Sequence, residues 1–248
     1  MAKLALITGG SRGIGAVTAT LLAGRGWDVC LSYREDADAA ATVVRDCEAT
    51  GVGAIAVRAD VSVETDVIEL FAQCDARLGA LDTLINNAGI VGPRARVDEL
   101  GADRLQQMMA VNVIGPFLCV REAVRRMSTR HGGAGGSIVN VSSAAARLGS
   151  PGEYVDYAAS KGAIDTMTLG LAREVADEGV RVNAVRPGII DTDIHASGGQ
   201  PDRAERLGPT LPMKRVGRAV EVASAIGWLC SDEASYVTGA ILDISGAR

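Results

Sequence analysis

Short runs of apolar residues recur along the chain, and longer stretches with helical periodicity separate most of them. Each run is apolar throughout instead of alternating with polar residues, which is typical of strands covered on both faces. The intervening stretches are long enough for the crossover helices that a parallel sheet requires. The pattern therefore predicts a doubly wound α/β fold with a parallel, seven-stranded sheet and helices on both faces. The predicted strands are 4–7, 29–31, 54–57, 83–85, 138–141, 182–185 and 241–244.

No repeat, low-complexity block or linker interrupts this order. A chain of 248 residues suits one large α/β domain, so we expect a single domain over residues 1–248. Segment 191–215 is the longest without regular periodicity, and irregular segments of that length are usually functional. We expect it to line the substrate pocket together with 91–96 and 144–155.

Composition narrows the class of protein. The chain is 3% aromatic and has 30 glycines, so its core must be packed from small and aliphatic residues. A net charge of −5 provides no global attraction for nucleic acid or anionic lipid. The amino terminus does not read as a secretory leader, and no segment reaches membrane-spanning length. We expect a cytoplasmic protein without a nucleic-acid or membrane partner.

The five cysteines are scattered and lack metal-ligand spacing. They are Cys30, Cys47, Cys74, Cys119 and Cys230. Most lie in apolar runs, so we expect reduced core residues and no metal site.

A glycine-rich turn follows the first predicted strand and opens a helix. It reads Thr8-Gly9-Gly10-Ser11-Arg12-Gly13-Ile14-Gly15. Free N–H groups and the dipole at a helix start favour an anion such as a pyrophosphate, and glycine allows close backbone approach. The T-G-x-x-x-G-x-G spacing differs from the common G-x-G-x-x-G fingerprint. Its place between a strand and a helix favours cofactor binding over a plain turn.

The end of the second predicted strand bears on the choice of dinucleotide. An acidic residue there commonly holds the ribose 2′-hydroxyl, whereas arginine accommodates a 2′-phosphate. Tyr33 takes the acidic position here, Arg34 follows it, and Arg12 lies in the glycine turn. Two guanidinium groups could converge on a phosphate, so we favour NADP(H) over NAD(H). Two alternatives stay open: Arg34 as a solvated loop residue, and Glu35 as the ribose ligand.

Polar residues also end the third and fourth predicted strands. Asp60 could accept a hydrogen bond from the adenine amino group, with helix capping as the alternative. The fourth strand ends in Asn86-Asn87-Ala88-Gly89, which is ordinary turn chemistry but also suits a floor beneath the cofactor.

Tyr157 and Lys161 are four residues apart, so in a helix their side chains project from one face. A nearby cation favours the phenolate and lowers the pKa of a tyrosine, which makes the pair a candidate proton donor. A solvated helix face is the alternative. Tyr154 is a weaker candidate, because its i+4 neighbour is Ala158.

The fifth predicted strand ends in Ser142 and Ser143, at the edge where ligands of open α/β sheets bind. Either hydroxyl could hydrogen-bond a substrate oxygen, with helix or turn capping as the alternative.

The helix that follows has two further faces. One is apolar and predicts core packing, and the other is built of small residues and suits either a subunit contact or internal packing. The apolar face is Ile164, Met167, Leu171 and Val175; the small-residue face is Ala159, Gly162, Ala163, Thr166 and Gly170.

Taken in order, these motifs, together with Pro187-Gly188, resemble the short-chain dehydrogenase/reductase family over residues 1 to about 246. The resemblance implies a Rossmann-type fold in which Tyr157 is the general acid or base and Ser143 orients the substrate carbonyl. It implies that Lys161 lowers the pKa of Tyr157 and binds the nicotinamide ribose. It also implies that Asn112 positions Lys161 through a water.

The cofactor site that the motifs and the resemblance together predict spans most of the chain. It comprises Gly9, Ser11, Arg12, Gly13, Ile14, Gly15, Tyr33, Arg34, Asp60, Val61, Asn87, Ala88, Gly89, Tyr157, Lys161, Pro187, Gly188, Ile190 and Thr192. Ile190 and Thr192 are expected beside the nicotinamide carboxamide. One departure is notable: Tyr157 lies fourteen positions after Ser143, one more than is usual, and the extra residue lies within 149–156 at the substrate mouth.

The resemblance further implies a homotetramer. The general pattern is similar to 3-oxoacyl-acyl-carrier-protein reductases and to glucose-dehydrogenase-like members. For the former, a cluster of arginines could dock an acidic carrier, with a solvated face or subunit contact as the alternative. The cluster is Arg121, Arg125, Arg126 and Arg130.

We therefore predict an NADP(H)-dependent oxidoreductase that interconverts a carbonyl and a secondary alcohol. A catalytically idle NADP-binding sensor and a scaffold protein are the alternatives.

Overall fold

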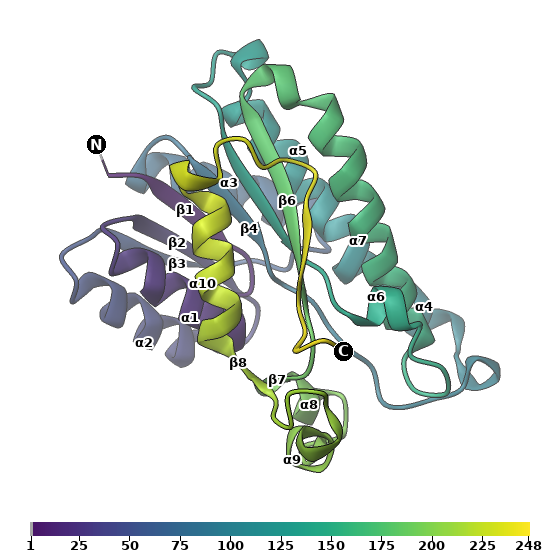
Figure 1. The fold of residues 1–248 in the computed structure, drawn as a ribbon. Helices are drawn as coiled ribbons and strands as arrows, with labels where there is room; N and C mark the ends of the chain where they lie inside the picture. Colours follow the sequence, from purple (N-terminus) through teal and green to yellow (C-terminus); the bar gives the residue numbers. More distant parts are fainter. Residues whose placement is uncertain (1) are drawn as a thin grey trace.

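A parallel sheet of seven strands forms the centre of the computed structural model, which describes residues 2–248 (Figure 1). The strand order is β3-β2-β1-β4-β5-β6-β9. The strands are β1 (Leu4–Ile7), β2 (Asp28–Tyr33), β3 (Ala54–Arg58), β4 (Thr83–Asn86), β5 (Gly136–Val141), β6 (Val180–Pro187) and β9 (Ile241–Ile244). All seven predicted strands and the doubly wound Rossmann-type fold are confirmed.

Helices cover both faces of the sheet, because successive strand residues point to opposite sides. In β1, Leu4 and Leu6 join the core that contains residues of α3, α5 and α7, whereas Ala5 and Ile7 join the core beneath α1, α2 and α10. The main helices are α1 (Gly13–Ala23), α2 (Ala37–Glu48), α3 (Glu64–Leu78), α4 (Ala102–Met109), α5 (Gly115–Met127), α7 (Val155–Glu174) and α10 (Ala219–Cys230). A short helix, α6 (Ala145–Leu148), follows β5.

The strand order reverses between β1 and β4, and this switch point is where open α/β sheets bind their ligands. The two strands are in register, with Ile7 opposite Ile85. The glycine-rich turn after β1 and the Asn87 region after β4 therefore leave the sheet side by side.

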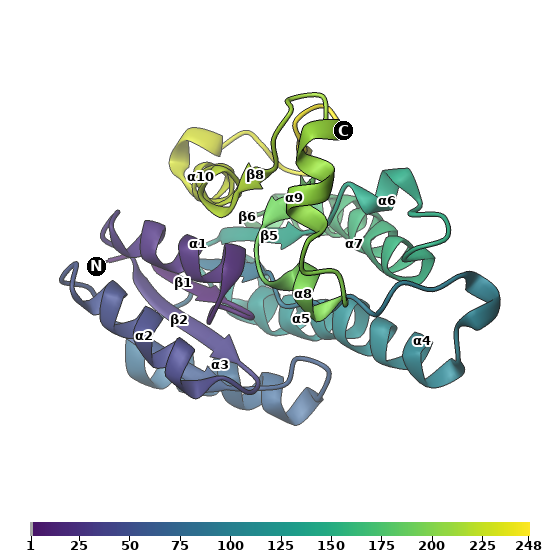
Figure 2. The ribbon, with the colours of Figure 1, turned by 90° about the horizontal axis from the view of Figure 1, so that it is seen from below.

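Segment 191–215 is more ordered than the sequence predicts. It contains α8 (Ile194–Ser197), α9 (Arg203–Leu207) and a 3-10 turn (Gly208–Thr210), and β7 (Ile190–Asp191) pairs with β8 (Gly217–Arg218) around it. Figures 1 and 2 show these pieces beyond the carboxyl ends of the strands. The expectation of an irregular segment was wrong because helices of four and five residues carry too little periodicity to read.

The two predicted faces of α7 behave differently. Ile164, Met167 and Val175 are buried and Leu171 packs against them, which confirms the core stripe. On the small-residue face, a Cβ added to Gly162 would meet nothing within 4 Å, and the same holds for Gly170. Internal packing therefore does not account for those glycines, and the subunit contact stays a prediction.

All five cysteines are buried and free, as predicted. Among residues 2–248, no helix is long and apolar enough to cross a membrane.

Candidate active site

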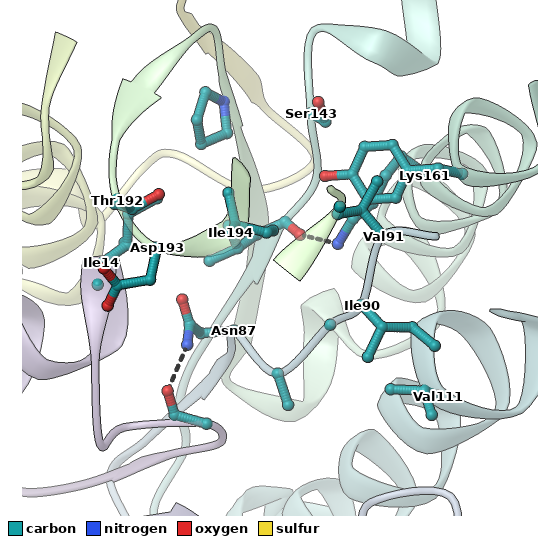
Figure 3. A pocket seen from close by; sticks show the side chains of 18 of the residues that line it. Ile14, Asn87, Ile90, Val91, Val111, Ser143, Lys161, Thr192, Asp193 and Ile194 are labelled. Carbon is teal, nitrogen blue, oxygen red and sulfur yellow. Dashed lines mark hydrogen bonds between the residues drawn. The ribbon is translucent and has the colours of Figure 1, made fainter. Parts of the chain in front are cut away.

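A cavity of about 830 Å³ lies at the carboxyl edge of the sheet (Figure 3). Every predicted site residue except Gly15 and Asn112 lines it. The predicted residues that line it are Gly9, Ser11, Arg12, Gly13, Ile14, Tyr33, Arg34, Asp60, Val61, Asn87, Ala88, Gly89, Ser143, Tyr157, Lys161, Pro187, Gly188, Ile190 and Thr192. Motifs spread over most of the chain thus meet in one place.

The glycine-rich turn is packed so closely that side chains do not fit. A Cβ on Gly9 would lie 3.0 Å from Ala88 Cα, and one on Gly15 would lie 2.5 Å from Asn87 Nδ2. Gly9 and Gly13 also have φ of +63° and +56°, which favour glycine. Arg12 begins α1 without a side-chain cap, so the first N–H groups of that helix are available to an anion. The turn therefore fits the pyrophosphate of a dinucleotide.

The ends of β2 and β4 hold this turn in place. Asn87 Nδ2 donates to Thr8 O and Gly9 O, each at 2.9 Å. Thr8 Oγ1 accepts from the backbone N–H groups of Asn87 and Ala88 at 3.0 Å, and Ser32 Oγ accepts from Gly9 N at 3.2 Å. The anchoring roles of Thr8 and Ser32 were not predicted, because these contacts join distant strands.

Two arginines lie together at the ends of β2 and β3. Arg34 is exposed and its Nε donates to Glu35 Oε1 at 2.9 Å, so the two residues proposed as alternatives form a pair. Arg58, opposite Tyr33 in the sheet, donates from Nε to Arg34 O at 3.1 Å. Sequence reasoning missed Arg58, since only strand register brings it beside Arg34.

Asp60 does not cap α3, since the N-cap of that helix is Val63 and no side chain caps it, and the adenine hydrogen bond stays a prediction. Asp60 Oδ1 accepts from Ser62 N at 2.9 Å and from Ser62 Oγ at 2.6 Å, which braces the turn before α3. Asp60 also lines the cavity, beside Val61.

Tyr157 and Lys161 lie on the first turns of α7, and they face the cavity instead of solvent. Lys161 is only 5% exposed, and its Nζ donates to Val141 O at 2.8 Å. Nζ lies 5.7 Å from the centroid of the Tyr157 ring. Figure 3 shows Lys161 and Ser143 on one wall, with Thr192 and Asp193 on the opposite wall near Ile14. A solvated helix face is excluded as the explanation for the pair.

Burial shifts the pKa values of both groups. It raises the pKa of Tyr157, and a hydrogen bond with Ser143 opposes that rise. Burial also lowers the pKa of Lys161 to about 8, and the carboxylate of Asp165 acts in the opposite direction. The pKa of Tyr157 is raised because the phenolate would lose its hydration on burial, and the expected lowering of this pKa by Lys161 stays a prediction.

The two serines after β5 have different surroundings. Ser143 Oγ accepts from Ala145 N at 3.1 Å and is hydrogen-bonded to Tyr157. Ser142 is buried and its Oγ donates to Lys161 O at 3.2 Å. The extra residue in 149–156 therefore leaves Ser143 beside the phenol, which favours Ser143 over Ser142 as the substrate-orienting hydroxyl.

Asn112 lies in a short π-helical segment (Ala110–Ile114) between α4 and α5, an irregularity often found at functional sites. Its amide exchanges hydrogen bonds with the backbone of Ile90, at 2.8 and 2.9 Å. A Cβ on Gly89 would lie 3.3 Å from Asn112 Oδ1 and 3.5 Å from Lys161 Nζ. Asn112 thus lies behind the cavity wall, near Lys161, and a bridging water stays a prediction.

Other lining residues were not predicted as site residues. Arg104 forms a two-pronged ion pair with the buried Asp156, at 2.8 and 3.2 Å, and its Nη1 donates to Pro93 O at 2.7 Å. It joins the loop after β4 to the start of α7. Tyr154, Arg203 and Arg248 line the same cavity. Long-range pairs of this kind have no local sequence signature.

The arginines on and after α5 are paired within the chain and do not line the cavity. Arg121 and Arg126 each contact two acidic residues, while Arg125 and Arg130 contact one each. The acidic partners are Glu64, Asp75, Glu122 and Glu178. This arrangement fits a solvated face better than a docking site for an acidic carrier.

A doubly wound sheet with a glycine turn at its switch point, and a phenol beside a buried ammonium, defines a dinucleotide-dependent oxidoreductase. The chain belongs to the short-chain dehydrogenase/reductase family. Residues 9–246 match the family model described as enoyl-(acyl carrier protein) reductase.

Similar proteins extend over the whole chain. It is 53% identical to the uncharacterized oxidoreductase YgfF of Escherichia coli, with 99% of each chain covered. It is 40% identical to cis-4-hydroxycyclohexanecarboxylate dehydrogenase of Sinomonas cyclohexanicum, with 98% and 95% covered. It is 36% identical to glucose 1-dehydrogenase 2 of Bacillus subtilis, with 98% and 93% covered. The protein is therefore an oxidoreductase acting on CH–OH groups.

Solved structures of similar proteins share this fold. The 3-ketoacyl-(acyl-carrier-protein) reductase of Brucella melitensis, complexed with NADH, has a TM-score of 0.91 at 31% identity, covering 99% of this chain and 98% of that one. A blue fluorescent protein from a metagenomic library, in complex with NADPH, has a TM-score of 0.88 at 35% identity, covering 99% and 97%. These neighbours support a nicotinamide cofactor without choosing between its two forms.

Proposed function

We propose that this protein interconverts a carbonyl compound and a secondary alcohol, with NADP(H) as the preferred cofactor. The observation that carries the proposal is the convergence of Tyr157, Ser143 and Lys161 on the cavity that the glycine-rich turn also lines. A sensor or scaffold needs no proton donor, cation and orienting hydroxyl in one place, so the arrangement favours an enzyme.

The nicotinamide supplies or accepts the hydride when it is bound. In the reductive direction, the Ser143 hydroxyl donates a hydrogen bond to the substrate carbonyl oxygen and Tyr157 protonates the alkoxide that develops there. In the oxidative direction, Tyr157 removes the proton from the alcohol. The hydrogen bond between Ser143 and Tyr157 keeps both hydroxyls close to one substrate oxygen.

Lys161 stabilises the negative charge that Tyr157 carries once its proton has left. With a pKa of about 8, the ammonium is mostly protonated at neutral pH. The raised pKa of Tyr157 keeps the phenol protonated until an alkoxide forms to accept the proton. Lys161 also binds the nicotinamide ribose, with Ile190 and Thr192, which line the cavity, beside the carboxamide.

The preference for NADP(H) rests on the arginines at the adenosine end. Arg12 and Arg34 both line the cavity there, and Tyr33 stands where a carboxylate would select the ribose 2′-hydroxyl. A 2′-phosphate would be held by two guanidinium groups, with Arg58 adding positive charge next to Arg34.

The decisive assay follows NADPH and NADH consumption with a panel of carbonyl compounds. We expect Tyr157→Phe to lower kcat by about 10² to 10⁴-fold, the usual contribution of a positioned general acid, while cofactor affinity changes little. Ser143→Ala should reduce kcat as well, and Ser142→Ala serves as the matched control. Undiminished turnover in Tyr157→Phe, or loss of turnover only in Ser142→Ala, defeats the mechanism. Cofactor binding without turnover on any panel member supports the sensor instead.

A further inference from the structure

Arg203 of α9 is a buried cation that lines the cavity. Arg203 is 8% exposed. Its Nη1 is enclosed and has no hydrogen-bond partner among the described residues. A buried guanidinium with an unused donor is costly, since lost hydration is not replaced. The proposed chemistry at Tyr157 does not use this group.

The rest of the guanidinium is fixed in place. Arg203 Nη2 donates to Glu153 Oε2 at 2.7 Å, and its Cζ lies 5.2 Å from the centroid of the Tyr154 ring. The Tyr154 hydroxyl is in turn hydrogen-bonded to Gln200 Nε2. One donor edge is thus used for anchoring, while Nη1 stays unpaired in the cavity wall. The anchors Glu153 and Tyr154 belong to the segment that contains the extra residue.

A second guanidinium lies close by. Arg248 lines the cavity and its pKa is lowered, first by burial and then by the positive charge of Arg203. Arg147 Nη2 and Ser245 Oγ donate to Arg248 O, at 2.8 and 3.2 Å, which hold this residue at the carboxyl edge. Figures 1 and 2 both show the carboxyl terminus on the side of the sheet where α8 and α9 lie.

We propose that Arg203 and Arg248 form a subsite for a carboxylate, so that the substrate is a keto acid or hydroxy acid instead of a neutral carbonyl compound. The inference rests on the proposed function, because it names the class of substrate that the same cavity accepts. Nη1 of Arg203 donates to a carboxylate oxygen, and the two cations together replace the water that the anion loses.

The local charges favour an anionic substrate. Glu153 neutralises one of the two arginines, and Arg104 is neutralised by Asp156. Asp193 also lines the cavity, near Thr192 and Ile14 (Figure 3). Arg94 also acts on Glu153, so the arginines outnumber the carboxylate that they face, and the excess positive charge suits an anion. A carboxylate brings one negative charge to this subsite, whereas a phosphate monoester brings close to two.

The test compares acids with their neutral esters. NADPH-dependent reduction is measured with linear keto acids of increasing length and 4-oxocyclohexanecarboxylate, each beside its methyl ester, and with a keto phosphate. We expect at least one acid to exceed its ester about tenfold or more in kcat/KM, mainly through KM, and the keto phosphate to be poorer. Arg203→Gln should remove most of this acid-to-ester ratio.

Arg248→Gln is a second test variant in case Arg203→Gln does not fold. It leaves the Arg203–Glu153 ion pair intact and should still reduce the acid-to-ester ratio of kcat/KM. Arg130→Gln is the matched control: the same charge change on an exposed residue outside the cavity, with no expected effect. Equal turnover of acids and esters, a ratio unchanged in both variants, or preference for the phosphate overturns the inference while the proposed function stands. Absence of turnover with every acid and ester counts against the proposed function itself.

Discussion

At the scale of the residue, Lys161 is the clearest case of a charged side chain that the fold removes from water. It is buried on α7, its Nζ donates to one carbonyl oxygen, and burial brings its pKa down to about 8. A lysine in the unfolded chain has a pKa near 10.4. The charged form of Lys161 is therefore less stable in the folded protein than in the unfolded chain. We attribute this loss of stability to the function of the residue.

This predicts a specific pH dependence of stability. Below pH 8 both folded and unfolded states hold the Lys161 proton, so the group adds no slope. Above pH 8 the unfolded state holds more protons than the folded state, so the free energy of unfolding rises with pH. The shift from the ordinary value to about 8 corresponds to a rise of about 3 kcal/mol when complete, partly expressed by pH 9.5.

Urea denaturation of the wild type and of Lys161→Met between pH 7 and 9.5 measures how the free energy of unfolding changes with pH. The variant should be the more stable protein at pH 7 and should lack this part of the slope. Lys214→Met, which removes an exposed lysine, should keep the wild-type slope. Parallel curves for wild type and Lys161→Met over this range would contradict the pKa assigned to Lys161.

At the scale of the element, the turn between β1 and α1 depends on the absence of side chains. A Cβ on Gly15 would lie 2.5 Å from both Asn87 Nδ2 and Gly9 O. Neither atom can move freely, because Asn87 Nδ2 donates to Gly9 O and Thr8 O. Replacing glycine by alanine within a helix ordinarily stabilises a protein by up to about 1 kcal/mol. A loss of stability in Gly15→Ala would therefore be caused by crowding of the new methyl group.

We therefore expect Gly15→Ala to weaken cofactor binding about tenfold or more and to lower Tm, because the turn must open to admit the methyl group. Fluorescence titration with NADPH and thermal unfolding provide the two readouts. Gly101→Ala is the control, since its φ is −75° and a Cβ there meets nothing within 4 Å. Wild-type affinity in Gly15→Ala would show that the turn is not the cofactor cradle.

Elements differ in how far the sequence predicts them. Strands such as β1 were located because a strand buried on both faces must be apolar throughout, and the glycine turn because its glycines mark the backbone conformation. Helices α8 and α9 were missed because each is too short to show a period. Ion pairs such as Arg104–Asp156 could not be predicted, because they depend on which loops the finished sheet brings together.

At the scale of the whole molecule, α7 joins the active site to an exposed surface. One face of the helix carries Tyr157 and Lys161 to the cavity. Another presents Gly162 and Gly170, where an added Cβ would meet no atom of residues 2–248 within 4 Å apart from the neighbouring backbone of the helix itself. Small residues on an exposed helix let a second backbone approach closely. We infer that this face packs against a second copy within the homotetramer that the family resemblance implies.

Gly162→Leu tests that packing. In an isolated chain the leucine side chain would find open space, and the helix would gain from the loss of glycine. In an assembly built through this face the same side chain would clash, so we expect light scattering to show a wild-type mass of four chains and a smaller species for the variant. Ala41→Leu, at an exposed position of α2, should leave the mass unchanged. A wild-type protein that is an active monomer, or a variant that assembles normally, would place the subunit contact elsewhere or remove it.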